Sequence, residues 1–418
     1  MADTLLYVRF GRRTVGIIEA DDTARIQFTY DPSWLSYVNA FPISVSLPLR
    51  SAPWTDAAAA WFANLLPEAG TRAAVCARLG ISEGNDLALL RAIGGECAGA
   101  LTISDRVVEE RASAAYEEIT PARIASLVRS DAVPLLLGGP AVRLSLAGAQ
   151  HKLPVTLLDG RLHLPLHGSP STHLLKLPDP RFAHLPLNEA FVMGLAGEIG
   201  FDIAHVDVFD GTKPPGLLVE RYDRRGSPPT TPVTRLHQED FCQATGRPSA
   251  RKYQEEGGPT LAECVAIVTR HTSRPIVDVR RLIEWQAFNV IVGNCDGHGK
   301  NLSLLYDGGD VRLAPFYDVL STRQYPSLDR KLAMGVGGRR DPAEVQRSDW
   351  ELFAREANLG ARVVLSTVSG IVERCLVAIP TWTTRYRERH GNRAILQTLP
   401  RWITRSAERV QRGLKAPR

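Results

Sequence analysis

The sequence predicts an α+β protein with a small mixed α/β domain at the N-terminus, a strand-rich segment after it and a largely helical C-terminal part. Alternating apolar and polar positions indicate early strands, short apolar runs indicate further strands near the middle, and helical spacing dominates after residue 236. With 418 residues, of which 44% are apolar and 23% charged, the chain has material for more than one folding unit. This composition excludes a wholly disordered or fibrous protein.

The composition also bears on location and on cysteine chemistry. No uncharged apolar run approaches the roughly 18–20 residues of a membrane-spanning helix. The first residues include Asp3 and Arg9, so they lack an apolar signal core and are typical of a first strand. We therefore expect a cytoplasmic protein without membrane contact. The six cysteines form no C-x-x-C pair, which favours reduced, mostly buried thiols over disulfides or a zinc ribbon.

The positive charge of the chain is local. The formal net charge is +5, and an excess of this sign hints at an anionic partner. Residues 381–418 contain ten Lys and Arg residues against two Glu residues, so this tail carries +8 and the remainder of the chain −3. The tail could contact DNA or a partner protein, or it could be only a solvated helical face.

The first 140 residues predict short strands, then helices, then a closing strand. Strands are expected around 5–7, 15–17 and 26–28, and apolar residues at helical spacing predict a helix within 54–66. Glycines at 94–99 precede a predicted strand near 99–103. The charged stretch 104–130 favours a helical connector.

The next segment predicts a sheet. Strand-like runs at 142–146 and 153–158 flank a short loop and suggest a hairpin, and further strands are expected at 161–166, 172–177 and 216–222. Asn188 is placed to cap a helix. The expected domain division is 1–107 for the N-terminal domain, 108–139 for a connector, 140–236 for a strand-rich segment with a phosphate loop, and 237–418 for a helical part with a catalytic loop and the basic tail.

Within the helical part, an apolar helix over 283–292 is expected to end at Gly293. Two short strands at 302–306 and 311–314 are joined through Asp-Gly-Gly, which is a strong hairpin signal. Helical periodicity resumes at Asp349 and continues to the end of the chain.

The strongest chemical signal is an aspartate followed five residues later by an asparagine. Asp296 and Asn301 have the D-x-x-x-x-N spacing of a protein-kinase catalytic loop, and Asp318 follows the hairpin as a second metal-holding carboxylate would. The pattern also suits turn residues that close a loop locally. A zinc site built on Cys295 and His298 is a weaker alternative, because no second His or Cys cluster completes four ligands.

Phosphoryl transfer also needs a cation near the phosphates, and Lys176 within an apolar strand could supply it, with Glu189 as an ionic partner. A snorkelling edge-strand lysine is the alternative interpretation. The loop from Ser145 to Lys152 holds one glycine, so it matches a glycine-rich phosphate loop poorly, although its N–H groups could still hold phosphate oxygens. Backbone groups of Glu220 and Tyr222 could pair with an adenine, or belong to an ordinary strand.

Taken together, these motifs resemble the HipA family of bacterial toxin kinases. The resemblance covers nearly the whole chain and rests on motifs that occur in order. They are Leu144-Ser145-Leu146-Ala147-Gly148-Ala149-Gln150-His151-Lys152, Thr172-His173-Leu174-Leu175-Lys176-Leu177-Pro178, Asn188-Glu189, Val219-Glu220-Arg221-Tyr222-Asp223-Arg224, His237-Gln238-Glu239-Asp240-Phe241-Cys242-Gln243, Gly293-Asn294-Cys295-Asp296-Gly297-His298-Gly299-Lys300-Asn301, Pro315-Phe316-Tyr317-Asp318 and Leu332-Ala333-Met334-Gly335. The block ending Gly95-Glu96-Cys97-Ala98-Gly99-Ala100-Leu101 resembles the small N-terminal domain of that family.

The resemblance implies a bilobal, protein-kinase-like fold and a serine/threonine kinase that acts as the toxin of a type II toxin–antitoxin pair, uses ATP and Mg²⁺, and phosphorylates an aminoacyl-tRNA synthetase. It implies Asp296 as catalytic base, Asn301 and Asp318 as magnesium ligands, Lys176 on the phosphates, and Ser145 as an autophosphorylation site that switches the kinase off. The implied nucleotide-binding residues are Ala147, Gly148, Ala149, Gln150, His151, Lys152, Lys176, Glu220, Arg221, Tyr222, His298, Gly299, Lys300, Asn301, Tyr317 and Asp318.

The implied partner is a dimeric helix-turn-helix antitoxin that ties the toxin to operator DNA. Two other functions stay open at this stage. One is a kinase-shaped corepressor that stabilises an antitoxin on DNA with catalysis secondary or lost, and the other is a small-molecule phosphotransferase.

The sequence departs from the family pattern at two places. His151 stands where acidic or other polar residues are common in the family, and the basic tail matches no motif.

Overall fold

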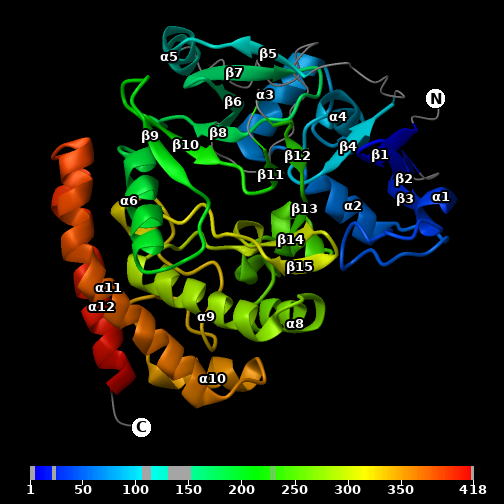
Figure 1. Cartoon of the computed structure of the whole chain (residues 1–418). Coiled ribbons are helices and arrows are strands. Elements are labelled where there is room, and N and C mark those ends of the chain that lie inside the picture. Colours follow the sequence, from blue (N-terminus) through cyan, green and yellow to red (C-terminus); the bar gives the residue numbers. More distant parts are fainter. Residues whose placement is uncertain are drawn as a thin grey trace. The chain divides into compact units, whose positions relative to one another are not determined.

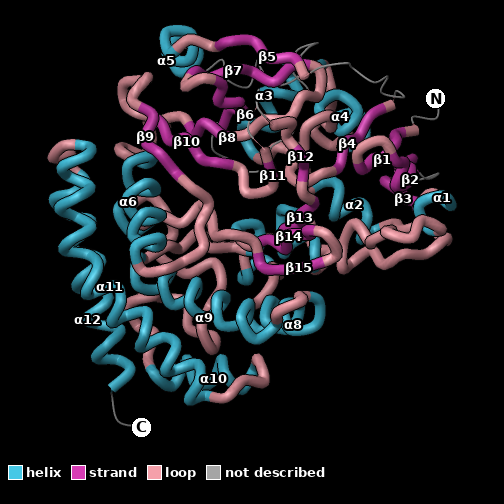
Figure 2. The backbone as a smooth tube through the Cα atoms, in the orientation of Figure 1, coloured by secondary structure: helices cyan, strands magenta, loops and turns pink. Residues whose placement is uncertain are grey.

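The computed structural model describes residues 5–20, 25–105, 114–129, 152–226, 228 and 231–415. The chain divides into two compact units, and each is described by itself. Unit 1 comprises residues 1–179, 209–250 and 305–309, and unit 2 comprises 180–208, 251–304 and 310–418. Figure 2 shows that the strands concentrate in unit 1 and the long helices in unit 2. The predicted α+β content is confirmed, whereas the predicted domain boundaries stay a prediction.

Unit 1 begins with an antiparallel sheet in the order β3-β2-β1-β4. Its core contains large side chains that are almost fully buried, among them Phe28, Trp34, Trp61 and Phe62. The expected early strands, the helix within 54–66 and the closing strand are all present. The elements are β1 (Leu6–Phe10), β2 (Arg13–Ala20), β3 (Ile26–Tyr30), α1 (Pro32–Leu35), α2 (Asp56–Ala63), α3 (Ala69–Leu79), α4 (Asp86–Ile93) and β4 (Leu101–Ser104).

A second sheet of unit 1 carries strands in the order β5-β7-β6-β8-β10. Most of these strands match the predicted ranges within a residue or two. The stretch expected to be a helical connector differs, because it contains a strand, β5, that pairs with β7 in antiparallel fashion. The elements are β5 (Ala115–Glu118), α5 (Pro121–Arg129), β6 (Lys152–Leu158), β7 (Arg161–Leu166), β8 (His173–Lys176) and β10 (Gly216–Glu220). The predicted strand at 142–146 lies outside the described residues.

Shorter elements complete unit 1. Strand β11 pairs with β12, and Asp240 caps the one-turn helix α7 in a capping box with Gln243. Their bounds are β11 (Arg224–Arg225), β12 (Thr234–Arg235), β13 (His237–Asp240) and α7 (Phe241–Ala244). Strands β9 (Val206–Phe209) and β14 (Ser303–Asp307) contain residues of both units.

Unit 2 is built on long helices. Helix α9 carries buried aromatic residues on its apolar side, including Trp285 and Phe288, and it ends at Val292 as predicted. The elements are α6 (Leu185–Glu198), α8 (Leu261–His271), α9 (Pro275–Val292), β15 (Asp310–Leu313), α10 (Arg347–Glu356), α11 (Ala361–His390) and α12 (Ile395–Lys415). Single 3-10 turns lie at Gln254–Glu256, Gly299–Asn301 and Thr322–Gln324, and a further one at Ser249–Arg251 contains residues of both units.

Helix α11 is the one helix of the described chain that is long and apolar enough to cross a membrane. In this structure it packs against α6, α9, α10 and α12, and Figure 1 shows α11 and α12 lying along each other. Val368, Ile371 and Cys375 are buried in these contacts. A core helix has the same composition, so α11 alone is weak evidence for a membrane span.

Two local predictions have different outcomes. Asn188 does not cap α6, because the helix begins three residues earlier, at Leu185, and Asn188 lies inside it. Its buried amide instead donates to the Ser321 carbonyl at 2.9 Å and accepts from the Ser321 N–H at 3.0 Å. The cysteine prediction is confirmed, because all six thiols are free and buried.

A buried cluster of charges joins distant parts of unit 1. Glu96 is fully buried and accepts hydrogen bonds from Ser171, Arg221 at 3.1 Å and Arg224 at 3.0 Å, and it also contacts Arg235. Burial by itself would raise the pKa of Glu96, but Arg224, Arg235 and Arg221 lower this pKa to about 2. The Glu96 carboxylate is therefore charged at neutral pH.

Replacing Glu96 by Gln should destabilise the folded chain strongly, because it leaves buried guanidinium groups without their counter-charge. Breaking a buried pair typically costs about 3–5 kcal/mol. Urea unfolding of Glu96→Gln should show a loss of this order. Glu117→Gln is the matched control, because it breaks the exposed Arg123–Glu117 pair and should cost about 0–1 kcal/mol. Equal effects of the two substitutions would contradict the prediction.

Two further buried groups of unit 1 have opposite pKa shifts. Glu239 accepts from the Tyr306 hydroxyl at 2.5 Å and the Val45 N–H at 2.9 Å, and burial raises its pKa to about 7. His237 donates to the Ile43 carbonyl at 2.8 Å, and burial lowers its pKa to about 4. Glu239 keeps its proton in the folded chain over a range where the unfolded chain loses it, so its contribution to stability falls as pH rises.

Glu239→Gln should therefore gain stability relative to the unsubstituted chain between about pH 4.5 and 7. The pKa shift corresponds to a relative gain on the order of 3 kcal/mol. His237 contributes in the opposite direction in both proteins, because its stabilisation is present above about pH 6.5 and lost toward pH 4. Urea unfolding across this range measures the difference between the two proteins. If the difference in unfolding free energy between Glu239→Gln and the unsubstituted chain does not change with pH, the raised pKa of Glu239 is refuted.

Candidate active site

The predicted catalytic loop begins where α9 ends. Gly293 has a φ of +65°, in the left-handed region, and a Cβ there would lie 2.3 Å from the Trp402 ring, so a side chain would collide. The Gly293 carbonyl accepts from the Thr322 hydroxyl at 3.1 Å, and that hydroxyl accepts from the Cys295 N–H at 2.8 Å. These contacts fix the direction in which the chain leaves the helix toward Asp296.

Asp296 stands in this loop with its side chain 48% exposed. Its backbone N–H donates to the Asn294 side chain at 3.1 Å, so a hydrogen bond between residues of the loop itself fixes its conformation. The Tyr253 hydroxyl donates to Asp296 Oδ1 at 2.5 Å, and His298 Nε2 lies 3.9 Å from the same oxygen. Among the described residues, no other side chain hydrogen bonds to this carboxylate. A half-exposed, oriented carboxylate is what a general base for an incoming hydroxyl requires.

Asn301 and Asp318 meet within unit 2. Asn301 Nδ2 donates to Asp318 Oδ2 at 3.0 Å, and Asn301 Oδ1 accepts from the His298 N–H at 3.3 Å. Asp318 has a φ of +59°, which is uncommon for a residue other than glycine. Strained backbone of this kind clusters at functional sites.

The segment that leads to Asp318 is anchored on both sides. The Tyr317 hydroxyl donates to the Lys300 carbonyl at 2.7 Å and shares a 2.7 Å hydrogen bond with Ser303. Phe316 is buried against Phe201, and the guanidinium of Arg281 lies 5.2 Å from its ring centre. The structure thus brings together the catalytic-loop residues and the second predicted aspartate.

In unit 1, Lys176 lies at the end of β8 and is only 4% exposed. The antiparallel register places it directly opposite Lys152 on β6 and opposite Leu217 on β10. Directly opposite residues of an antiparallel pair have Cβ atoms roughly 4.5–5.5 Å apart and project to the same face. Two lysines of the predicted phosphate site therefore share one face of the sheet.

The residues predicted beside the adenine have different surroundings. Glu220 ends β10 and is exposed, and the Tyr222 hydroxyl donates to the Gln238 side chain. The Arg221 guanidinium is committed to the buried cluster, with bonds to Glu96 and Asp223. The backbone N–H of Arg221 donates to the Thr172 carbonyl at 2.9 Å. We therefore assign Arg221 a supporting role, and the adenine prediction depends on Glu220 and Tyr222.

Several predicted site residues lie outside the described residues, and the structure says nothing about them. These are Ser145, Ala147, Gly148, Ala149, Gln150 and His151.

The zinc alternative gains no support. Within the described ranges, no group of three or more His, Cys, Asp or Glu side chains could hold a metal ion. Burial raises the pKa of Cys295 to about 11, so forming the thiolate that a zinc ligand needs is more costly there than at an ordinary cysteine.

The sequence reasoning missed Tyr253. It lies 43 residues before Asp296, and only the tertiary structure places its hydroxyl on the carboxylate of the predicted catalytic base. No local spacing rule could have connected the two residues.

Comparisons with known proteins agree with this geometry. The family model of the HipA-like C-terminal domain matches residues 144–382, and that of the HipA N-terminal domain matches residues 6–104. A Sinorhizobium fredii protein named "Putative kinase Y4mE" is 42% identical over 91% of this chain and 92% of its own length. The Shewanella oneidensis serine/threonine-protein kinase toxin HipA is 29% identical over 90% of this chain and 88% of its own.

A solved structure agrees as well. The chain is similar, with a TM-score of 0.84 and 25% identity, to a chain in the complex of Shewanella oneidensis HipA, HipB and operator DNA, and 97% of each chain is covered. The family model and the relatives named as kinases define the chain as a kinase, and the predicted α+β, kinase-like fold is confirmed. The chain belongs to the HipA family.

Proposed function

We propose that this chain is an ATP-dependent serine/threonine protein kinase and the toxin of a type II toxin–antitoxin system. The observation that carries the proposal is the half-exposed Asp296, which lies in one braced loop with Asn301, while Asn301 itself pairs with Asp318. Membership of a family of kinases supports the same activity.

In this proposal, Asp296 accepts the proton of a substrate hydroxyl whose oxygen forms a bond to the γ-phosphorus, while the bond between that phosphorus and ADP breaks. Asn301 and Asp318 would hold Mg²⁺. Their donor set fits it, because Mg²⁺ prefers oxygen ligands from one or two carboxylates together with phosphate oxygens. When bound, Mg²⁺ neutralises charge on the phosphates.

The remaining predicted residues would bind the nucleotide. Lys152 and Lys176 lie directly opposite each other on β6 and β8, and their ammonium groups would bind the nucleotide phosphates. Glu220 and Tyr222 would seat the adenine. The loop residues Ala147 to His151 would cover the phosphates, and His298, Gly299, Lys300 and Tyr317 would complete the site.

The proposed regulation and partners follow the family. Ser145 would be the autophosphorylation site and an aminoacyl-tRNA synthetase the substrate. The similar Shewanella oneidensis HipA was solved with HipB and operator DNA, which supports an antitoxin and operator DNA as partners of this chain. The antitoxin would be a dimeric helix-turn-helix protein, and the complex would act in the cytoplasm. A corepressor without catalysis is the second candidate, but intact Asp296, Asn301 and Asp318 favour the kinase.

Asp296→Asn should abolish phosphoryl transfer, because an amide cannot accept the substrate proton. We expect purified chain with radiolabelled ATP and Mg²⁺ to label itself on Ser145 and to arrest growth on expression, and Asp296→Asn to lose both effects. ATP should still raise the thermal midpoint of the variant. Full labelling and toxicity of Asp296→Asn would refute the kinase, and no Mg²⁺-dependent stabilisation of either protein by ATP would favour the corepressor.

The basic tail is only partly neutralised within unit 2. Arg385 pairs with Glu198, and Arg389 pairs with Asp207 at 2.7 Å. Arg401, Arg405 and Arg412 are exposed, whereas Arg409 is half-buried, donates to Ser406 at 2.8 Å and has a pKa that burial lowers. The three exposed arginines on α12 are therefore the proposed DNA contacts.

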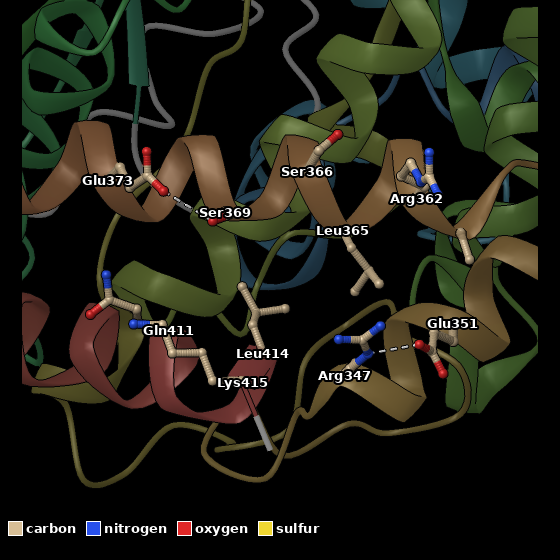
Figure 3. Close-up of a pocket in the computed structure, with 11 residues that line it drawn as sticks. Arg347, Glu351, Arg362, Leu365, Ser366, Ser369, Glu373, Gln411, Leu414 and Lys415 are labelled. Atoms are coloured by element: carbon tan, nitrogen blue, oxygen red, sulfur yellow. Dashed lines mark hydrogen bonds and ion pairs between the residues drawn. The ribbon is translucent and has the colours of Figure 1, made fainter. Parts of the chain in front are cut away.

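A groove of about 570 Å³ lies near the end of α12, among α10, α11 and α12. Figure 3 shows that its charged side chains are mixed in sign and partly paired, with Arg347 directed at Glu351 and Ser369 bonded to Glu373. None of the predicted site residues lines it. The groove therefore adds no anion site to the exposed arginines.

Reversing the charge of Arg401, Arg405 and Arg412 together should weaken DNA association and make it less dependent on salt. Each lost phosphate contact lowers the slope of log K against log salt by about 0.9. ATP-dependent labelling should not change. The control is Arg123→Glu, an exposed charge reversal in unit 1. If a fluorescence titration shows that the variant binds DNA as well as the unsubstituted chain, the basic tail is only a solvated helical face.

A further inference from the structure

The contact between Tyr253 and Asp296 joins a tyrosine without an assigned role to the proposed catalytic base. The hydroxyl is 2.5 Å from Asp296 Oδ1, which is a short hydrogen bond to a carboxylate. The terminal torsion of an aspartate side chain is broad and roughly two-fold, so nothing intrinsic to Asp296 fixes its oxygen atoms. A donor on one oxygen restricts that rotation.

Tyr253 is held in place by its neighbours. The Gln254 N–H donates to the Ala333 carbonyl at 3.0 Å, and the Gln254 side chain accepts from the Gly335 N–H at 2.8 Å. The Gly258 N–H donates to the Tyr253 carbonyl at 2.8 Å. These contacts anchor the backbone on both sides of the tyrosine.

The ring of Tyr253 is also held against the catalytic loop. It meets the His298 ring edge to face, with centroids 5.2 Å apart. The preceding Lys252 carbonyl accepts from the Gly299 N–H at 3.4 Å. The hydroxyl therefore projects from a fixed backbone and a packed ring, so it can impose an orientation on Asp296.

We propose that Tyr253 is a positioning residue for the phosphoryl transfer, an inference that rests on the proposed kinase function. Tyr253 holds Oδ1 of Asp296 and so presents Oδ2 to the substrate hydroxyl. No described side chain hydrogen bonds to that second oxygen, and the carboxyl side chain is 48% exposed. The phenol keeps its own proton throughout, while the proton of the substrate moves to Oδ2.

The test is Tyr253→Phe in the full chain, which removes the hydroxyl and keeps the ring against His298. We expect the rate of self-labelling at saturating ATP and Mg²⁺ to fall at least tenfold, since small misplacement of a catalytic group is costly. The KM for ATP should stay within twofold, and the thermal midpoint should change little. Tyr386→Phe is the control, because its hydroxyl bonds to the Leu187 carbonyl instead, and it should label at the normal rate.

The outcomes separate the two proposals. If Asp296→Asn is inactive while Tyr253→Phe labels at the normal rate or faster, the kinase stands and the positioning role falls. A faster variant would mean that the tyrosine blocks the base. If Tyr253→Phe raises the KM for ATP and lowers the thermal midpoint in proportion to its lost rate, the residue is merely structural and the proposal also falls. If Asp296→Asn labels normally, both proposals fall.

Discussion

The hydroxyl of Thr322 ties together the two segments that carry the proposed catalytic residues. It donates to the Gly293 carbonyl, where α9 ends, and accepts from the Cys295 N–H one residue before Asp296. Thr322 itself follows Asp318 by four residues, so one buried side chain links the proposed catalytic loop to the second aspartate. The same two segments carry Asn301 and Asp318, whose side chains meet at 3.0 Å. A buried hydroxyl that uses both its donor and its acceptor specifies one arrangement, because any other would leave a polar group unpaired.

Buried side-chain hydrogen bonds also fix the segments around the site. Asn188, inside α6, bonds to both backbone groups of Ser321, next to Thr322, and so fixes the segment that follows Asp318. Tyr253 reaches the loop from a third direction. Thr322 and Tyr253 therefore hydrogen bond to the loop from two separate parts of unit 2, and Asn188 holds the segment that follows Asp318. This convergence explains how a short turn region can hold Asp296 half-exposed and still oriented.

In unit 1, buried ion pairs hold distant segments of the chain together. Glu96 and Asp223 face Arg221 and Arg224 in a fully buried cluster, and Asp223 also accepts from the Gly99 N–H at 2.7 Å. The cluster joins the segment around Glu96 to the segment that follows Glu220, which carries the proposed adenine contacts. Desolvation of these charges is expensive, so such a cluster persists only where every member is paired. The N-terminal part of the chain therefore takes part in holding the proposed nucleotide segment.

The sequence by itself determined the local elements and the chemical motif. The strands near Lys176, the end of α9 at Gly293 and the spacing of Asp296 and Asn301 follow from periodicity, glycine conformation and residue order, which are properties of neighbouring residues. Only the tertiary structure decided which distant groups meet. In the structure, Asn188 lies inside a helix instead of capping it, and Arg221 belongs to a buried ion cluster. Lys152 lies opposite Lys176 on the neighbouring strand. The Tyr253 hydroxyl contacts the Asp296 carboxylate. The reason is physical, because the partner of a buried polar group is chosen by the packing of the whole chain and is not encoded in its own neighbourhood.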